Sequence, residues 1–434
     1  MKFLVGSPHS EGAAVSELAS WASEQVGIAG DRFRGTVDAC DINEPSADKR
    51  AITTRHLQID PEPYRLPNGW IPQRVVAYGS TDPFIDNNPL VAAAASDFVA
   101  EILKTTNRLA TTNEAVLTYL SSCRPRRGRR PTVVTKGLID LDPGFGRWIQ
   151  SLPDAEQLRV VAQPWSDTPT ILHNKRDGGI VELPNSKFLR ALTGGANDGW
   201  GVRERAAEEA EIIRSHLAEN AAMFRRGPLR IASVGSGTGE PMMDAAAAAL
   251  LQEFGTANSP MITVYGADLN PSSLAVAEHL ASTRFTQLKF NSVRTNFLNK
   301  VDLRSFLSKA RPHVVEMMGV AEYIPAEGAR VETERRQRSL MRKVGLMSAE
   351  EFHATIYDSL TSGSIFVTGN MSTDSPEVDF VQHGLGWKGI IPRSTADYLR
   401  VLADAGIPGA AVELHVPNPG DSSGVYTMVS IKRL

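Results

Sequence analysis

The chain has 434 residues, of which 42% are hydrophobic and 22% are charged, and its formal net charge is -3. This composition is typical of globular domains and excludes collagen-like and disordered chains, while the slight negative charge argues against a protein-wide attraction to nucleic acid. The two cysteines have no metal-ligand spacing, so neither a disulfide framework nor a zinc site is predicted. No apolar run is long enough to span a bilayer and the opening MKFLVGSPHSEG lacks a secretory signal, so we expect a cytoplasmic protein.

The length predicts more than one domain. We place a boundary after the turn-rich HNKRDGG segment, which gives an N-terminal α/β or α+β domain over residues 1–185 and a second domain over residues 186–434. In the first region the sequence predicts helices that begin near Ala13 and Pro89, and a hairpin whose turn contains Asp177 and two glycines. Runs rich in β-branched residues predict strands at Arg74–Tyr78, Pro131–Thr135 and Leu158–Ala162.

The segment CRPRRGRRP concentrates five arginines between Arg124 and Arg130. Such a cluster could hold phosphate or RNA, or it could be a solvated loop between two elements. No aromatic residue is interleaved with the arginines and the chain is acidic overall, so we favour the solvated loop and do not expect a nucleic-acid partner.

The second region alternates strand-like and helix-like runs, which is typical of parallel strands joined by crossover helices. Seven runs predict strands: LRIASV, ITVYGAD, LKFNSV, HVVEMM, SIFVTGN, AAVELHV and VYTMVSIKRL. Only NPGDSSG separates the last two, which is too short for a crossover helix, so this pair is predicted to be antiparallel. The predicted fold is α/β, with a seven-stranded sheet that is mostly parallel and ends in an antiparallel hairpin.

Helix boundaries in this region carry local signals. Ser348 with Glu351, and Ser394 with Asp397, have the spacing of a capping box, and Gly406 suits a helix C-terminus. Upstream, DGWGVRERAAEEAEIIRSHL predicts an amphipathic helix that packs on the domain, because one face carries Val202, Ala206, Ala210, Ile213 and Leu217.

The segment RIASVGSGTGEP places Gly235, Gly237 and Gly239 between a predicted strand and a predicted helix. Glycines there let the backbone turn tightly and approach a ligand, and the helix start offers free amide groups. The dinucleotide fingerprint G-x-G-x-x-G fails because Glu240 stands at the third glycine position, and no Lys-Ser or Lys-Thr completes a phosphate loop. On the next strand, Asp268 at the carboxyl end of YGADLNP could accept hydrogen bonds from ribose hydroxyls or could cap the following helix.

With these motifs, residues 200–434 resemble a class I S-adenosylmethionine-dependent methyltransferase. The resemblance rests on GxGxG after a strand, on Asp268 as the acidic ribose ligand and on the closing antiparallel pair at Ala410–Leu434. It implies a Rossmann-like fold and S-adenosylmethionine as cofactor. The cofactor site that it implies comprises Gly235, Ser236, Gly237, Gly239, Glu240, Asp268, Leu269, Asn296, Phe297, Met317, Met318 and Gly319.

Within this implied site, Asn296 would contact adenine, and the Met317–Gly319 segment would flank the adenine and the sulfonium, although a methionine pair is more often core. One position departs from the family's pattern. The acidic residue usual two positions before the first glycine is Ser233 here, which weakens the prediction of cofactor binding. Glu240 could supply the charge instead, or it could simply be a favourable anion in a first helical turn.

On the acceptor side, Glu322 and Tyr323 resemble the polar and aromatic pair of small-molecule methyltransferases, and we predict catalytic roles for them. His383 is the candidate base, because its ordinary pKa is near neutral and it lies in a long connection after the fifth strand. The candidate substrate contacts are Trp387 in that connection and Trp200 and Arg203 at the start of the leading helix. No metal ligands are assigned.

We therefore predict a methyltransferase that uses S-adenosylmethionine to methylate oxygen, nitrogen or carbon of a small organic acceptor, with a homodimer left open. The N-terminal region would cover the site or contribute acceptor contacts. Three alternatives stay open: an aminopropyl transferase on a related fold, an RNA-binding or RNA-modifying protein that uses the arginine loop, and an inactive cofactor-binding module.

Overall fold

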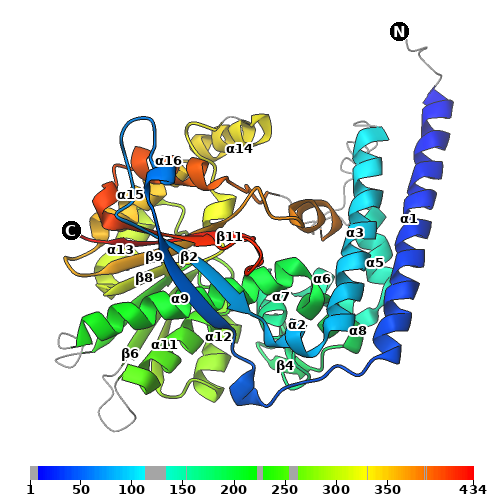
Figure 1. Ribbon diagram of the computed structural model, residues 1–434, viewed down its shortest axis with the longest axis horizontal. Coiled ribbons are helices and arrows are strands. Elements are labelled where there is room, and N and C mark those ends of the chain that lie inside the picture. Colours follow the sequence, from blue (N-terminus) through cyan, green and yellow to red (C-terminus); the bar gives the residue numbers. More distant parts are fainter. Residues whose placement is uncertain are drawn as a thin grey trace.

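The computed structural model describes residues 8–112, 133–152, 154–221, 228–253, 262–329, 331–385, 387 and 389–434. At its centre is a nine-stranded sheet with the order β1-β2-β10-β11-β9-β8-β5-β6-β7 (Figure 1). Its strands are β1 (Thr53–Ile59), β2 (Arg74–Thr81), β5 (Leu229–Val234), β6 (Ile262–Asp268), β7 (Leu288–Arg294), β8 (Val314–Met317), β9 (Ile365–Met371), β10 (Val412–Pro417) and β11 (Tyr426–Lys432). All of them run in one direction except β1 and β11.

The seven strands predicted for the second region are all present and adjacent in the sheet, and β11 is antiparallel to both its neighbours as predicted. This confirms the α/β class and the mostly parallel, Rossmann-like arrangement that the resemblance implies. The predicted count of seven strands is wrong, because β1 and β2 extend the sheet beyond β10. The run Arg74–Tyr78 does form a strand, so residues of the first region complete the sheet of the second. The domain boundary near residue 185 stays a prediction.

Helices cover both faces of the sheet, as crossover connections require. On one face lie α9 (Asn197–Glu219), α11 (Glu240–Glu253) and α12 (Pro271–Thr283), and on the other α13 (Lys300–Ala310), α15 (Ala349–Ser359) and α16 (Thr395–Asp404) (Figure 1). In the first layer, Ile213 and Leu217 pack with Met242 and Met243 against the strands, which confirms the predicted amphipathic helix. Strand β9 is buried along its whole length, as expected for a strand covered on both faces.

The remaining helices and the small hairpin belong mainly to the first region. The helices are α1 (Pro8–Ala39), α2 (Pro83–Asn87), α3 (Pro89–Thr112), α5 (Val133–Leu141), α6 (Pro143–Ser151), α7 (Asp154–Ala162), α8 (Lys187–Gly195) and, near the second sheet face, α14 (Glu332–Lys343). Short helical turns are η1 (Ala47–Lys49), η2 (Glu62–Tyr64), η3 (Ala321–Tyr323), η4 (Phe380–Gly384) and η5 (Gly409–Ala411). The long helices α1 and α3 lie side by side and extend away from the sheet (Figure 1). Strands β3 (Thr170–His173) and β4 (Ile180–Leu183) form the predicted hairpin, with Gly178 at a positive φ.

Two strand predictions in the first region are wrong. Leu158–Ala162 lies in α7, and the described part of Pro131–Thr135 lies in α5. Val134 and Leu138 are four residues apart and both are buried, so in α5 the apolar side chains follow helical rather than strand spacing. A five-residue apolar run cannot distinguish these two structures by itself, and tertiary packing decides.

The predicted helix boundaries are confirmed. Ser348 and Glu351 form a reciprocal capping box, and the Ser394 hydroxyl accepts a hydrogen bond from the Asp397 N–H at 3.2 Å. Gly406 follows α16 with φ +75°. Within the described ranges, none of the helices combines the length and the apolar character that a membrane crossing would need.

Candidate functional site

The glycine loop joins β5 to α11 at the carboxyl end of the parallel strands. Gly235, Gly237 and Gly239 all have positive φ angles, of +71°, +54° and +67°, which L side chains rarely adopt. The N–H groups of Gly235 and Ser236 donate to the Ala267 carbonyl at 2.8 and 3.0 Å, so the loop is fastened to β6. A Cβ on Gly237 would lie 2.5 Å from Cβ of Ala155, which belongs to α7. The three glycines are therefore required by the loop itself.

Asp268 lies at the end of β6, directly beside this loop. Its Oδ2 accepts a hydrogen bond from the Gly237 N–H at 2.9 Å, and its Oδ1 accepts one from the Asn270 N–H at 2.7 Å. Burial raises the pKa of this carboxyl, and the backbone hydrogen bonds oppose that shift. The cap of α12 is Asn270, whose side chain accepts from the Ser272 N–H. Asp268 thus orders the glycine loop, and the neighbouring Leu269 is 55% exposed.

The end of β7 brings Asn296 and Phe297 to the same sheet edge. The side-chain oxygen of Asn296 accepts a hydrogen bond from the Leu298 N–H at 3.3 Å and so stabilises a turn. The Phe297 ring borders the glycine loop, because its Cζ would lie 3.3 Å from a Cβ on Gly235. Of the predicted cofactor contacts, the structure therefore brings Asp268 and Phe297 directly against the loop.

Ser233 is paired with a carboxylate that sequence reasoning missed. Strands β5 and β8 are neighbours, and their register places Ser233 opposite Glu316. The Ser233 hydroxyl donates to Glu316 Oε2 at 2.5 Å, and the Met318 N–H donates to Oε1 at 2.6 Å. Burial raises the pKa of Glu316 to about 7. A buried carboxyl of the adjacent strand thus lies directly at Ser233, and a lone glutamate inside the apolar run HVVEMM was the signal that could have revealed it.

Two charged side chains of α9 complete this cluster. The Arg205 guanidinium lies over the Tyr426 ring, 4.4 Å from its centroid, and Nη1 has no hydrogen-bond partner. Glu209 is 1% exposed, and its Oε1 likewise has no partner among the described residues. Burial, and secondly the nearby Glu316 carboxyl, raise the pKa of Glu209. Arg205, Glu209 and Glu316 border a cavity of about 80 Å³ over the glycine loop.

Helix α7 covers this cavity, and it reaches the site through a buried ion-pair network. Ala155 and Leu158 line the cavity, together with the unpartnered hydroxyl of Ser236. Arg159 of α7 pairs with Glu156 at 2.7 Å and with Glu240 at 3.1 Å. A second arginine, Arg284, also pairs with Glu240, at 3.3 Å. Glu240 therefore joins α11 to α7.

The two predicted substrate contacts on α9 are engaged within the protein. Arg203 donates to Asp82 Oδ2 and to three backbone carbonyl oxygens, those of Val161, Thr193 and Gly194. It is 6% exposed, so its donors are used in fastening α9 to α7 and α8. The indole N–H of Trp200 donates to Ser80 Oγ at 2.9 Å. The structure does not bring either side chain to the cavity at the glycine loop.

The other predicted residues lie in the hydrophobic core, beside the glycine-loop cavity or outside the described residues. Met317 is fully buried in the core, whereas Met318 borders the cavity and Gly319 has φ +73°. Tyr323 is half-buried and packs against the hydrophobic cluster that joins helices of the first region to Phe380 and Tyr426. Trp387 is 4% exposed and donates to Gln157 Oε1 at 3.0 Å, away from the glycine loop. The side chain of His383 and the Arg124–Arg130 segment lie outside the described residues.

A hollow of about 790 Å³ adjoins the glycine-loop cavity. It lies between α9, α11 and the segment before β1, and it shares Arg159, Ala162 and Ala206 with the smaller cavity. The apolar side chains of Trp165 and Ala245 line it, together with arginine side chains that each form an ion pair with a carboxylate.

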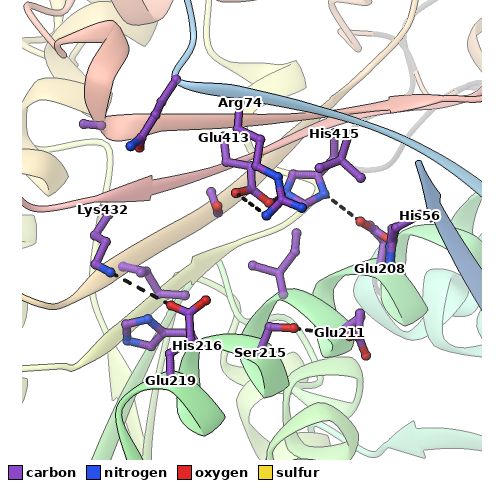
Figure 2. A pocket seen from close by; sticks show the side chains of 16 residues that line it. His56, Arg74, Glu208, Glu211, Ser215, His216, Glu219, Glu413, His415 and Lys432 are labelled. Carbon is purple, nitrogen blue, oxygen red and sulfur yellow. Dashed lines mark hydrogen bonds and ion pairs between the residues drawn. The ribbon is translucent and has the colours of Figure 1, made fainter. Parts of the chain in front are cut away.

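A third cavity, of about 300 Å³, lies at the opposite edge of the sheet, where β2, β9 and β10 begin (Figure 2). Glu208 of α9 bridges two histidines there: its Oε1 is 2.7 Å from His415 Nδ1 and its Oε2 is 2.7 Å from His56 Nε2. Burial disfavours the charged ring, but hydrogen bonds to Glu208 and Glu413 outweigh it and raise the pKa of His415 to about 9. Arg74 forms an ion pair with Glu413, and Lys432 forms one with Glu219, so most of the charged groups in Figure 2 are paired with one another.

No family model matches the chain, and no curated protein does. Among solved structures it is similar to a possible exported protein from Bordetella parapertussis, with 14% identity over 79% of this chain and 96% of that chain and a TM-score of 0.45. It is also similar to an O-methyltransferase family protein from Burkholderia thailandensis, with 14% identity over 56% and 60% of the two chains and a TM-score of 0.33. Magnesium protoporphyrin IX methyltransferase from Synechocystis PCC 6803, with bound SAH, matches at 14% identity over 54% and 87% and a TM-score of 0.30. TM-scores below 0.5 leave the function to be inferred from the site itself.

Proposed function

We propose that this chain is an S-adenosylmethionine-dependent methyltransferase that acts on a small organic acceptor. One observation carries the proposal: a buried guanidinium and two buried carboxyls surround the cavity over the glycine loop. The methionine end of the cofactor bears a carboxylate, an ammonium and a sulfonium. Arg205 Nη1 is unpartnered and can donate to the carboxylate, while Glu209 and Glu316 can accept from the ammonium.

The nucleoside end of the cofactor fits the neighbouring strand ends. The Asp268 carboxyl accepts backbone N–H groups from Gly237, Asn270 and Leu269, and a carboxylate has about four lone-pair sites, so it could still accept a ribose hydroxyl. The Phe297 ring and the exposed Leu269 side chain offer apolar surface for adenine. The bound cofactor would supply a methyl group activated by the positive sulfonium. The protein would orient the donor and stabilise its charge with the buried carboxyls.

The size of the cavity adds one requirement. Binding pockets for molecules of this size have volumes of about 300–1,000 Å³, whereas the cavity at the loop is about 80 Å³. Ala155 and Leu158 of α7 line it. We infer that α7 moves away from the glycine loop when the cofactor binds, which would join this cavity to the larger hollow beside it.

Calorimetric titration of the full chain tests the proposal. Saturable binding of S-adenosylmethionine and S-adenosylhomocysteine, and none of NAD, is expected. Glu316→Gln should weaken binding about 10-fold to 100-fold, because a hydrogen bond to a charged group contributes about 1.5–3 kcal/mol. Glu219→Gln is the matched control, since that carboxyl is on α9 but 68% exposed, and it should bind like the wild type. Absence of binding to both sulfur compounds would refute the proposed function.

A further inference from the structure

Two more buried carboxyls lie beside Arg205, on the side of the loop after β8. Glu322 belongs to η3 and Asp198 to the first turn of α9. A Cβ built on Gly319 would lie 3.5 Å from Arg205 Nη1 and 3.7 Å from Glu322 Oε1, so the guanidinium and this carboxyl face one point above Gly319. This group is distinct from Glu209 and Glu316, which border the glycine-loop cavity.

Each of the two carboxyls has one oxygen without a hydrogen-bond donor among the described residues. Glu322 is 4% exposed and Asp198 is 6% exposed, and the oxygens concerned are Glu322 Oε2 and Asp198 Oδ1. No lysine or arginine of the described chain lies within ion-pair distance of either one. The helix start at α9 is already served by Glu377, which accepts from the Asp198 N–H at 2.8 Å. Buried acids without partners are costly, which points to a missing donor.

Acidic groups outnumber basic groups around Arg205. The carboxyl groups of Asp198, Glu209, Glu316 and Glu322 lie near its guanidinium, and Arg393 is a second positive charge near Glu322. Burial, and then the nearby Glu377 carboxyl, raise the pKa of Asp198 to about 7, which relieves part of this excess without a ligand. The proposed cofactor would bring its positive charge to the Glu209 and Glu316 end of the cluster, so Glu322 Oε2 and Asp198 Oδ1 would still lack hydrogen-bond donors.

We propose that the methyl acceptor is an amine, held as its ammonium ion between Glu322 and Asp198, so that the enzyme methylates nitrogen. This inference rests on the proposed function and deepens it. An alcohol or thiol acceptor would bring no positive charge to these oxygens, and a carboxylate acceptor would be repelled by them. An ammonium ion supplies both the charge and the N–H donors that Glu322 Oε2 and Asp198 Oδ1 lack.

The reaction balances with these groups alone. Glu322 takes one proton from the ammonium and so frees the nitrogen lone pair. That lone pair forms the N–C bond to the methyl carbon while the S–C bond breaks, and the bonding pair stays on sulfur, which becomes a neutral thioether. The methylated amine leaves as a cation, and the proton on Glu322 passes to water.

The test compares acceptors that differ only in the nucleophile. The full chain is incubated with S-adenosylmethionine and with amines such as phenethylamine, histamine and putrescine, alongside the matched alcohols, thiols and carboxylic acids. S-adenosylhomocysteine and methylated products are measured by mass spectrometry. Transfer to amines at least about tenfold faster than to their matched compounds is expected. Transfer only to oxygen, sulfur or carboxylate, or to none of the compounds while S-adenosylhomocysteine still binds, overturns the amine assignment and leaves the cofactor assignment standing.

Variants separate the two halves of the site. Glu322→Gln should lower kcat/KM for the amine about 100-fold, the contribution of a general base, while the Kd for S-adenosylhomocysteine stays within about threefold. Glu209→Gln should have the opposite effect: the Kd for S-adenosylhomocysteine should rise more than kcat/KM for the amine falls. Because Glu322→Gln removes an unpaired buried charge, the Tm of this variant without ligand should not fall. An unchanged Tm would exclude a folding defect as the cause of lost activity. Asp198→Asn should raise KM for the amine by at least about tenfold. Full activity of Glu322→Gln would overturn the proposal.

Discussion

Replacing Glu208 by glutamine tests whether the two-histidine bridge shown in Figure 2 holds the β1–β2 extension to the rest of the sheet. The Glu208 side chain is 0% exposed and makes two 2.7 Å contacts, to His56 of β1 and His415 of β10. Removing one partner of a buried ion pair costs about 3–5 kcal/mol, because the remaining charge is left unpaired. We expect a loss of that size in the free energy of unfolding near pH 6.

The pH dependence gives a second readout with a definite sign. The pKa of His415 is raised from 6.5 to about 9 in the folded chain, so the folded state binds a proton more tightly than the unfolded state. The stabilisation from charged His415 is complete below about pH 6.5 and is lost as the pH rises towards 9. His56 has a raised pKa from the same carboxylate and adds to the same trend. In Glu208→Gln this decline between pH 6.5 and 9 should become shallower, with the part due to Glu413 remaining.

Urea unfolding monitored by circular dichroism, at pH 6 and pH 9, measures both effects. Glu219→Gln is the control, because this carboxyl lines the same cavity but is 68% exposed and 4.0 Å from Lys432. An exposed pair contributes at most about 1 kcal/mol, so the control should change little at either pH. A loss below about 1 kcal/mol in Glu208→Gln, or an unchanged pH slope, would refute the reasoning.

Two further substitutions probe the loop and its support. Gly237→Ala should cost about 1–3 kcal/mol in unfolding free energy and weaken S-adenosylhomocysteine binding, because φ is +54° and the new Cβ would meet Ala155. Gly328→Ala, where a Cβ meets nothing within 4 Å, is the control, and equal effects of the two changes would contradict this account. Arg203→Lys keeps the charge but loses contacts to three carbonyl oxygens, so we expect a cost of about 2–4 kcal/mol in thermal or urea unfolding. Arg336→Lys, whose side chain is 78% exposed, should be nearly neutral.

Sequence reasoning worked where local chemistry determines the outcome. The glycine loop was predictable because positive φ angles at three alternate positions are strained for any other residue type. The capping box at Ser348 and the antiparallel closing pair were also predictable, because a helix cap and a short connection are determined by residues close together in the sequence.

Sequence reasoning failed where long-range packing decides. Strand β1, with the sequence TTRHLQI, is a mostly exposed edge strand, so its sequence has no regular alternation of apolar and polar residues. Leu158–Ala162 has strand-like composition, but Arg159 within it pairs with Glu156 one helical turn away and with Glu240 far along the chain. The importance of Glu316 depends on the β5–β8 register, which no local pattern in the sequence specifies.

The pairing of β2 with β10 has a consequence for how the protein is made. On the side away from β1, residues from Arg74 onward pair only with residues from Glu413 onward. During synthesis on the ribosome, the β1–β2 hairpin must therefore wait until β10 has emerged, and such late, distant pairing slows folding. Until then the hairpin exposes an unpaired strand edge, which is where a nascent chain is most open to aggregation and to capture by chaperones.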